Sequence, residues 1–224
     1  MKLKLTLSLL FLAIAGSLSA QADFMLPREG FFPGTLHYKN GKVRTVLVSA
    51  PKHTKQGTII IRETPTADKE KVPSASLDSI SITPKKGITY CFEHLPWYYK
   101  KDGNPKKAMW LYVTLKGYAT LYLWYETFII DRHGNATTVK YTTQGYSTTN
   151  TYMLRKKNEK TAVYFISVPS SGIAIGFNAA FKKVANQYLS EDKDLLDKID
   201  KKQLTYDDPE EVIAIYNNFM SKKQ

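Results

Sequence analysis

The sequence predicts an α+β protein in which an antiparallel β-sandwich or barrel-like body is followed by a C-terminal three-helix segment packed on it. Three observations favour this fold class. Strand-forming segments separated by turn residues recur about every ten residues over the first part of the chain. Apolar residues then recur with the period of helices. A short apolar leader precedes both parts. We therefore expect a signal peptide at residues 1–22, a β-rich domain at 23–176 and a helical segment at 177–224.

The leader has the three parts of a secretory signal peptide. Lys2 and Lys4 precede an apolar run at residues 5–14, and Ala20-Gln21-Ala22 has the small-x-small form of a cleavage site before Asp23. A run of about ten apolar residues is too short for a membrane span, which needs about 20. We expect an exported protein, periplasmic or secreted to the cell surface, with no transmembrane span after signal removal.

Composition limits the kinds of site that this chain can hold. Hydrophobic residues at 43% and charged residues at 23% are typical of a globular protein. A single cysteine, Cys91, excludes an intramolecular disulfide framework and a multi-cysteine zinc site. The four histidines are isolated, with no metal-ligand spacing. We expect no metal and no cofactor.

The charge is uneven along the chain. The net charge is +12, and the basic excess lies in the β-rich part, whereas residues 181–224 are close to neutral. A basic surface is compatible with an anionic partner such as an anionic glycan. The alternative is that the lysines only maintain solubility and discourage pairing between strand edges.

The β-rich part contains ten candidate strands. Asn40-Gly41 and Lys116-Gly117 indicate hairpins between them, because glycine accepts the backbone conformations of tight turns. The candidate strands are Gly34–Tyr38, Lys42–Ser49, Thr58–Arg62, Ser79–Thr83, Ile88–His94, Trp110–Leu115, Tyr118–Ile130, Thr137–Tyr141, Thr151–Arg155 and Ala162–Val168.

Three helices are expected after residue 177. Ser190 is the expected cap of the second helix, and Asp208-Pro209 starts the third with a capping side chain and a proline at the first helical position. Each helix has one apolar stripe that must pack on another element. The stripes contain Phe181, Val184, Ala185, Tyr188 and Leu189, then Leu195, Leu196 and Ile199, then Val212, Ile213, Ile215, Tyr216, Phe219 and Met220.

No recognisable catalytic motif is present, and we assign no catalytic residue. Cys91 and His94 lie three apart on one predicted strand, so they point to opposite faces and cannot form a nucleophile pair. Glu93 and Glu126 are the acidic residues in the interior of strong strand candidates. A hydrolase acting on glycan or peptidoglycan through one of them is the enzymatic alternative.

Aromatic residues gather between positions 97 and 128. Alternation along the hairpin predicts one aliphatic face and one aromatic face, the latter carrying Trp110, Tyr112, Tyr118, Tyr122, Trp124 and Phe128. Two interpretations are open. We favour a second core layer covered by the C-terminal helices. The alternative is a partly open face that stacks on sugar rings or on apolar groups of a partner. The candidate binding residues are Trp97, Tyr98, Tyr99, Lys100, Lys101, Trp110, Tyr112, Tyr122 and Trp124.

The C-terminal part carries a degenerate pattern of Tyr-Leu, an acidic turn, Leu with Lys-Ile, an aspartate-led cap and a final Tyr-Asn. It comprises Tyr188-Leu189, Glu191-Asp192, Leu195, Lys198-Ile199, Tyr206, Asp207-Asp208 and Tyr216-Asn217. In this order of elements the chain resembles uncharacterised exported proteins of Bacteroidetes with a β-rich body and a short helical C-terminal region ending near Tyr-Asn. The resemblance implies residence in the envelope or outside the cell, and it supplies no active site.

These observations leave three hypotheses. The first is an exported non-enzymatic binding or interaction module of the cell envelope, with an anionic glycan or an envelope protein as its partner. The second is the hydrolase that uses Glu93 or Glu126. The third is a small outer-membrane-associated protein.

Overall fold

The computed structural model describes residues 30–85, 87–99, 103–131, 133–142, 145–147, 150–169 and 176–223. This part of the chain is α+β, with a large β-sheet followed by three helices, so the predicted fold class is confirmed. The predicted signal peptide at residues 1–22 lies outside the described residues, as do Lys100 and Lys101.

Ten strands form one sheet in the order β13-β12-β8-β7-β6-β5-β1-β2-β3-β4. Their bounds are β1 Phe31–Tyr38, β2 Val43–Ser49, β3 Thr58–Arg62, β4 Glu70–Pro73, β5 Leu77–Lys85, β6 Ile88–Tyr98, β7 Lys106–Leu115, β8 Ala119–Trp124, β12 Asn150–Lys156 and β13 Ala162–Val168. A smaller sheet holds β9 Thr127–Ile130, β10 Ala136–Thr142 and β11 Gly145–Ser147. The helices are α2 Phe177–Tyr188, α3 Lys193–Asp200 and α4 Pro209–Ser221, with a short 3-10 helix at Ser74–Ser76.

Part of the large sheet closes into a five-stranded barrel. β13 pairs in parallel with β6 at two positions, Ala162 with Trp97 and Val163 with Tyr98, and this closes the ring β6-β7-β8-β12-β13. The long strand β6 makes the closure possible because its first half pairs with β5 and its last residues pair with β13. The sheet therefore divides into a barrel and an N-terminal half that share β6.

The N-terminal half has its own core on the outer face of β6 and β7. Phe92 and Trp110 lie there with aliphatic residues of β1 to β5. The Trp110 indole donates a 2.9 Å hydrogen bond to the Ser74 hydroxyl, and the Trp110 backbone N–H donates to the Thr54 carbonyl at 2.8 Å. Because these bonds satisfy its polar groups, the large Trp110 side chain is buried without penalty.

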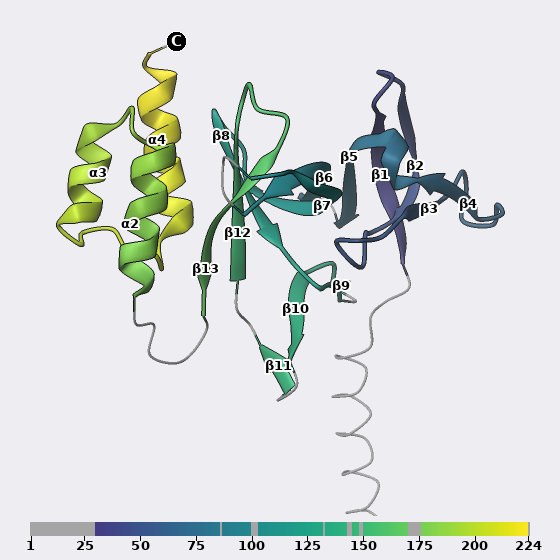
Figure 1. The fold of residues 1–224 in the computed structure, drawn as a ribbon. Coiled ribbons are helices and arrows are strands. Elements are labelled where there is room, and N and C mark those ends of the chain that lie inside the picture. The colour runs from purple at the N-terminus through teal and green to yellow at the C-terminus, as the bar shows by residue number, and fades with distance from the viewer. Residues whose placement is uncertain are drawn as a thin grey trace, which may run out of the picture.

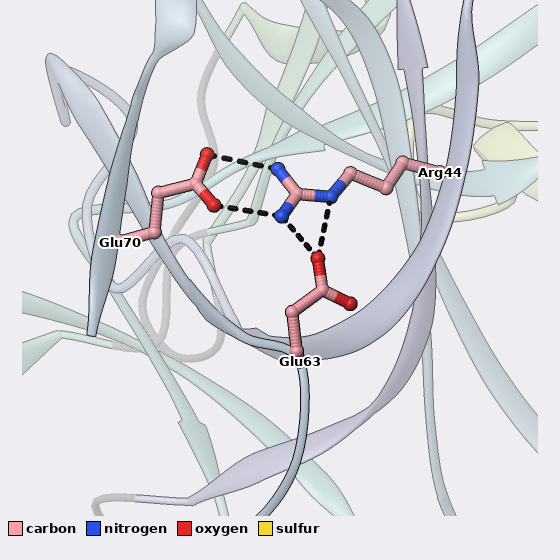
Figure 2. A network of polar contacts seen from close by, with 3 residues as sticks. All are labelled: Arg44, Glu63 and Glu70. Carbon is pink, nitrogen blue, oxygen red and sulfur yellow. Dashed lines mark hydrogen bonds and ion pairs between the residues drawn. The ribbon is translucent and has the colours of Figure 1, made fainter. Parts of the chain in front are cut away.

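An arginine cluster holds the outer strands β2, β3 and β4 together (Figure 2). Arg44 of β2 forms a bidentate ion pair with Glu70 of β4, with N–O distances of 2.8 and 2.7 Å. It also pairs with Glu63, which directly follows β3. The two carboxylates raise the pKa of Arg44, and Arg44 in turn lowers the pKa of Glu70. Both carboxylates are exposed, so the cluster aligns the edge strands and adds little stability.

The helices pack on the outer surface of the barrel, beside β13 and β12 and on the opposite side of the molecule from β1 to β4 (Figure 1). They cover the aliphatic residues of β8, Ala119, Leu121 and Leu123. Of the expected aromatic face, Tyr112 and Tyr118 pack against this helix-side cluster, and for the remaining rings the expectation that the helices cover them is wrong. The reason is an irregularity between Val113 and Leu115, which shifts the β7–β8 register by one residue.

This shift decides which side chains share a face. Tyr112 lies opposite Leu123, and Val113 lies opposite Tyr122, so the expected aromatic set is split between the two faces of the sheet. Tyr122 and Trp124 point into the barrel cluster, whereas Trp110 and Phe128 belong to the N-terminal core.

The predicted strand Tyr118–Ile130 is also interrupted, because β8 ends at Trp124 and β9 begins at Thr127. Tyr125 leaves the barrel at this point and is buried in the N-terminal core, where its hydroxyl donates to the Pro51 carbonyl at 2.9 Å. Glu126 therefore lies between two strands, and its predicted position inside one is wrong.

The helix starts follow the sequence with two corrections. α4 begins at Pro209 after Asp208, as predicted, but the Asp208 side chain does not cap the helix and instead accepts hydrogen bonds from the backbone N–H and the hydroxyl of Thr205. The cap of α3 is Asp192 rather than Ser190, and its side chain accepts a 3.0 Å hydrogen bond from the Leu195 N–H. This carboxylate satisfies an N–H that would otherwise lack a partner at the helix start.

Candidate functional site

One end of the barrel is open, and we call the cavity there the barrel mouth. It is formed where β6 and β8 end, where β7 and β12 begin and along the later residues of β13. Its volume is about 800 Å³, within the range of small-molecule sites in proteins. The mouth exists because closure of the ring brings residues of five strands to the same end of the barrel.

Four aromatic side chains surround the mouth: Trp97, Tyr99, Trp124 and Tyr164. The ring of Tyr99 lies 4.8 Å from that of Trp97 and 6.0 Å from that of Tyr164, measured between centroids. Tyr99 is 65% exposed, which is unusual for a large aromatic residue. The mouth therefore offers exposed ring surface next to rings that are held in place by packing.

Three lysines add positive charge to the same cavity. Lys106 and Lys107 begin β7, and Lys55 approaches from the loop between β2 and β3. All three are exposed, and none forms an ion pair with another described residue. No aspartate or glutamate is among the described residues that line the mouth. Among the described residues that line the mouth, the charge is therefore only positive.

The floor of the mouth is apolar. Met109 of β7 and Met153 of β12 are 3% and 1% exposed and belong to the cluster of side chains inside the barrel. Thioether side chains are flexible and adapt to irregular surfaces. Three hydroxyls complete the lining of β12 and β13, and they bond to one another: Thr151 to Ser167 at 2.9 Å, and Tyr164 to Ser167 at 3.2 Å.

A polar network lies deeper inside the barrel. The Arg155 guanidinium donates to Glu93 at 2.6 Å and to the Tyr122 hydroxyl at 2.8 Å, and that hydroxyl donates to the same Glu93 oxygen at 2.8 Å. Burial, and then the Glu93 charge, raise the pKa of Tyr122. For Arg155, burial lowers the pKa, but Tyr122 and Glu93 more than offset this, so the pKa is raised. The three groups neutralise one another and link β6, β8 and β12.

The structure brings together some of the sequence-predicted binding residues and separates others. Trp97, Tyr99 and Trp124 meet at the mouth. Tyr122 is inside the barrel, fully buried, and Tyr98 packs on the cluster beneath the helices. Trp110 is in the N-terminal core, and Tyr112 packs against both that core and the helix-side cluster.

Sequence reasoning missed most of the remaining lining: Lys55, Lys106, Lys107, Met109, Met153, Tyr164 and the two hydroxyl residues. For β12, alternation was a usable signal, since Thr151, Met153 and Arg155 share one face and all point into the barrel. Nothing in the sequence indicates that β13 pairs with β6. The sequence therefore could not predict that these residues meet in one cavity.

Glu93 and Glu126 do not line the mouth. Cys91 belongs to the barrel cluster, whereas the His94 ring lies 5.0 Å from Trp110 in the other core, so the prediction that the two point to opposite faces is confirmed. The described ranges contain no cluster of three or more metal-ligating side chains of the His, Cys, Asp or Glu type. Among the same residues, no helix has the length and apolarity needed to cross a membrane.

Comparison of the chain with protein-family models, with curated proteins and with solved structures finds no match.

Proposed function

We propose that this protein is an exported, non-enzymatic binding module of the cell envelope, and that its ligand enters the barrel mouth. The observation that carries the proposal is the coincidence of exposed aromatic surface and three lysines in one cavity whose described lining holds no carboxylate. Aromatic faces stack on rings and apolar groups, and a group of positive charges attracts an anion.

The charge and the aromatic lining of the barrel mouth together define the kind of ligand that it can bind. Lys55, Lys106 and Lys107 attract a negatively charged group, while Trp97 and Trp124 contact the body that carries it. An anionic glycan meets the charge requirement and can offer a ring face to the aromatic residues, so it belongs in the first panel of ligands to test. An envelope protein would have to place an acidic side chain with a neighbouring apolar group in the same cavity.

The hydrolase alternative has little support from the geometry. The Glu93 carboxylate is engaged by Arg155 and Tyr122, and Glu126 lies in the connection between β8 and β9. A glycosidase needs two carboxyl groups that face the scissile bond from one cavity. The described lining of the mouth supplies none.

The binding proposal is tested by calorimetric titration of the mature protein with anionic glycans and other small organic anions at about 50 mM and about 300 mM salt. We expect at least one to bind, with an affinity that falls at higher salt and falls about tenfold in Tyr99→Ala. Val43→Ala is the matched control, since Val43 is the other large exposed hydrophobic residue of the described chain. Binding that is equally affected by both substitutions, or no binding by any anion, would refute the proposal.

Export is part of the same proposal, and it depends on the leader, residues 1–22. N-terminal sequencing of the protein recovered outside the cytoplasm should begin at Asp23. An intact leader on a protein retained in the cytoplasm would contradict export and leave the binding experiment unaffected.

A further inference from the structure

We infer that the ligand of the barrel mouth is an organic anion with an apolar body, such as a planar ring system or an alkyl chain, rather than a polyhydroxylated sugar. This inference rests on the proposed function and narrows it, because it names the class of ligand that the lining selects. It depends on the apolar floor of the cavity and on the few free hydroxyl protons in the lining of β12 and β13, which are separate from the exposed lysines.

The floor offers contact surface without polar groups. Met109 and Met153 close the inner end of the cavity, and Trp97, Trp124 and Tyr164 form its walls. A ligand that reaches this floor must leave water and contact thioether and ring carbons. Transfer from water to such an environment is favourable for apolar groups and unfavourable for hydroxyls without partners.

The hydroxyls of the lining are largely occupied by one another. Tyr164 donates its proton to Ser167, and one further proton is shared between Ser167 and Thr151. A hydroxyl has one proton to donate, so of the three protons in this group only one is left for a ligand. A pyranose ring carries several hydroxyls, each of which needs a partner once it is removed from water. The part of the lining away from the exposed lysines therefore offers few hydroxyl donors to a buried sugar.

The lysines lie where an acidic group would remain close to water. Lys106, Lys107 and Lys55 are exposed, whereas the methionines below them are buried. An amphiphilic anion that enters with its apolar end first would place its carboxylate, sulfonate or phosphate beside these ammonium groups. A small anion without an apolar body would meet only the exposed lysines, where solvent and salt screen the attraction.

The experiment titrates the full mature chain with four probes: 2-naphthoate, dodecanoate, the neutral 2-naphthalenemethanol and a sulfated disaccharide. Binding is followed by calorimetry. We expect 2-naphthoate or dodecanoate to bind at least tenfold more tightly than the neutral alcohol and than the disaccharide. Lys106→Ala/Lys107→Ala should weaken binding of the anion about tenfold and leave binding of the alcohol unchanged. Lys71→Ala/Lys116→Ala is the control, because both lysines are exposed and neither lines the mouth.

The outcomes separate the two proposals. Tight binding of the disaccharide with weak binding of both apolar anions would overturn the inference and leave the proposed function standing. Equal binding of the anions and the neutral alcohol would also overturn it, because charge would then have no role. Failure of all four probes to bind would count against the inference, and it would refute the proposed function only if the wider panel of anions failed as well.

Discussion

Asn217 of α4 uses its side-chain amide to pair with the backbone of Ala119, the first residue of β8. Asn217 Nδ2 donates to the Ala119 carbonyl at 2.9 Å, and Asn217 Oδ1 accepts from the Ala119 N–H at 2.7 Å. The amide thus acts as one residue of a neighbouring strand, joining positions 98 residues apart in the chain. Ala119 is fully buried, so these two bonds satisfy backbone groups that water does not reach.

Replacing Asn217 by alanine should lower the free energy of unfolding by about 2 kcal/mol, because two buried backbone groups lose their partners. Urea denaturation measures this change. Asn218→Ala is the control, since Asn218 is the next residue on the helix and is exposed. A loss in Asn217→Ala no larger than that in the control would show that the amide does not anchor α4.

Gly117 should be intolerant of a side chain for a related reason. A Cβ atom at position 117 would overlap the carboxamide of Asn217. We expect Gly117→Ala to destabilise the protein by about 1–3 kcal/mol through overpacking. The double variant with Asn217→Ala should lose less than the sum of the two single changes, since the smaller side chain removes the overlap. Strict additivity in this double-mutant cycle would contradict the contact.

The network of Glu93, Tyr122 and Arg155 should behave as a partly buried ion pair. Glu93→Ala leaves the Arg155 guanidinium without its counter-charge, and we expect a loss of about 3 kcal/mol in the free energy of unfolding. Glu93→Leu/Arg155→Leu should recover most of that loss, because it replaces the pair by apolar groups. If the double variant is as unstable as Glu93→Ala, the loss of stability does not come from the unpaired charge of Arg155, and the prediction is wrong.

His94 should make folding stability depend on pH. Burial, together with the charge of Lys39, lowers the pKa of His94 from 6.5 to about 4. Between these values the unfolded chain binds a proton that the folded chain does not, so stability rises from pH 4 to pH 6.5 and is then constant with respect to this group. The contribution is about 1–2 kcal/mol, allowing for solvent screening of this partly exposed ring.

Denaturation at several pH values checks this effect. His94→Gln should flatten the slope between pH 4 and pH 6.5, the interval set by the shifted and ordinary pKa of His94. His37→Gln, the same substitution at an exposed histidine of β1, is the matched control. An unaltered slope in His94→Gln would mean that the ring is protonated equally in the folded and unfolded states.

Local patterns were sufficient for most elements. Turn residues such as Asn40-Gly41 separate the strands as expected, and Asp208-Pro209 marks the start of α4. Strand β4 was missed because Glu70–Pro73 is short, polar and ends in proline, so it carries no alternating pattern. Its pairing with β3 and the bond between Arg44 and Glu70 stabilise it, and these are tertiary interactions.

The faces of the β7–β8 hairpin and the candidate site depended on features that no local pattern contains. One irregularity near Thr114 shifts the pairing of β7 with β8 by one residue, which exchanges the faces on which their side chains meet. Leu111 and Val113 therefore share the barrel interior with Tyr122. The meeting of Trp97 with Tyr164 at the mouth follows from the parallel pairing of β13 with β6. Closure of the five-stranded barrel depends on pairing between strands that are far apart in the chain. The sequence therefore identifies the aromatic residues but not which of them face the same cavity.

The central claim is that ligands enter the barrel mouth, and the three tryptophans test it directly. Trp97 and Trp124 line the mouth, whereas Trp110 is buried in the N-terminal core and bonded to Ser74. In ¹H–¹⁵N spectra, assigned with Trp97→Phe and Trp124→Phe variants, titration with 2-naphthoate should shift the indole signals of Trp97 and Trp124 and leave that of Trp110 in place. A shift confined to Trp110, or no shift of the two mouth indoles by an anion that calorimetry shows to bind, would contradict the account.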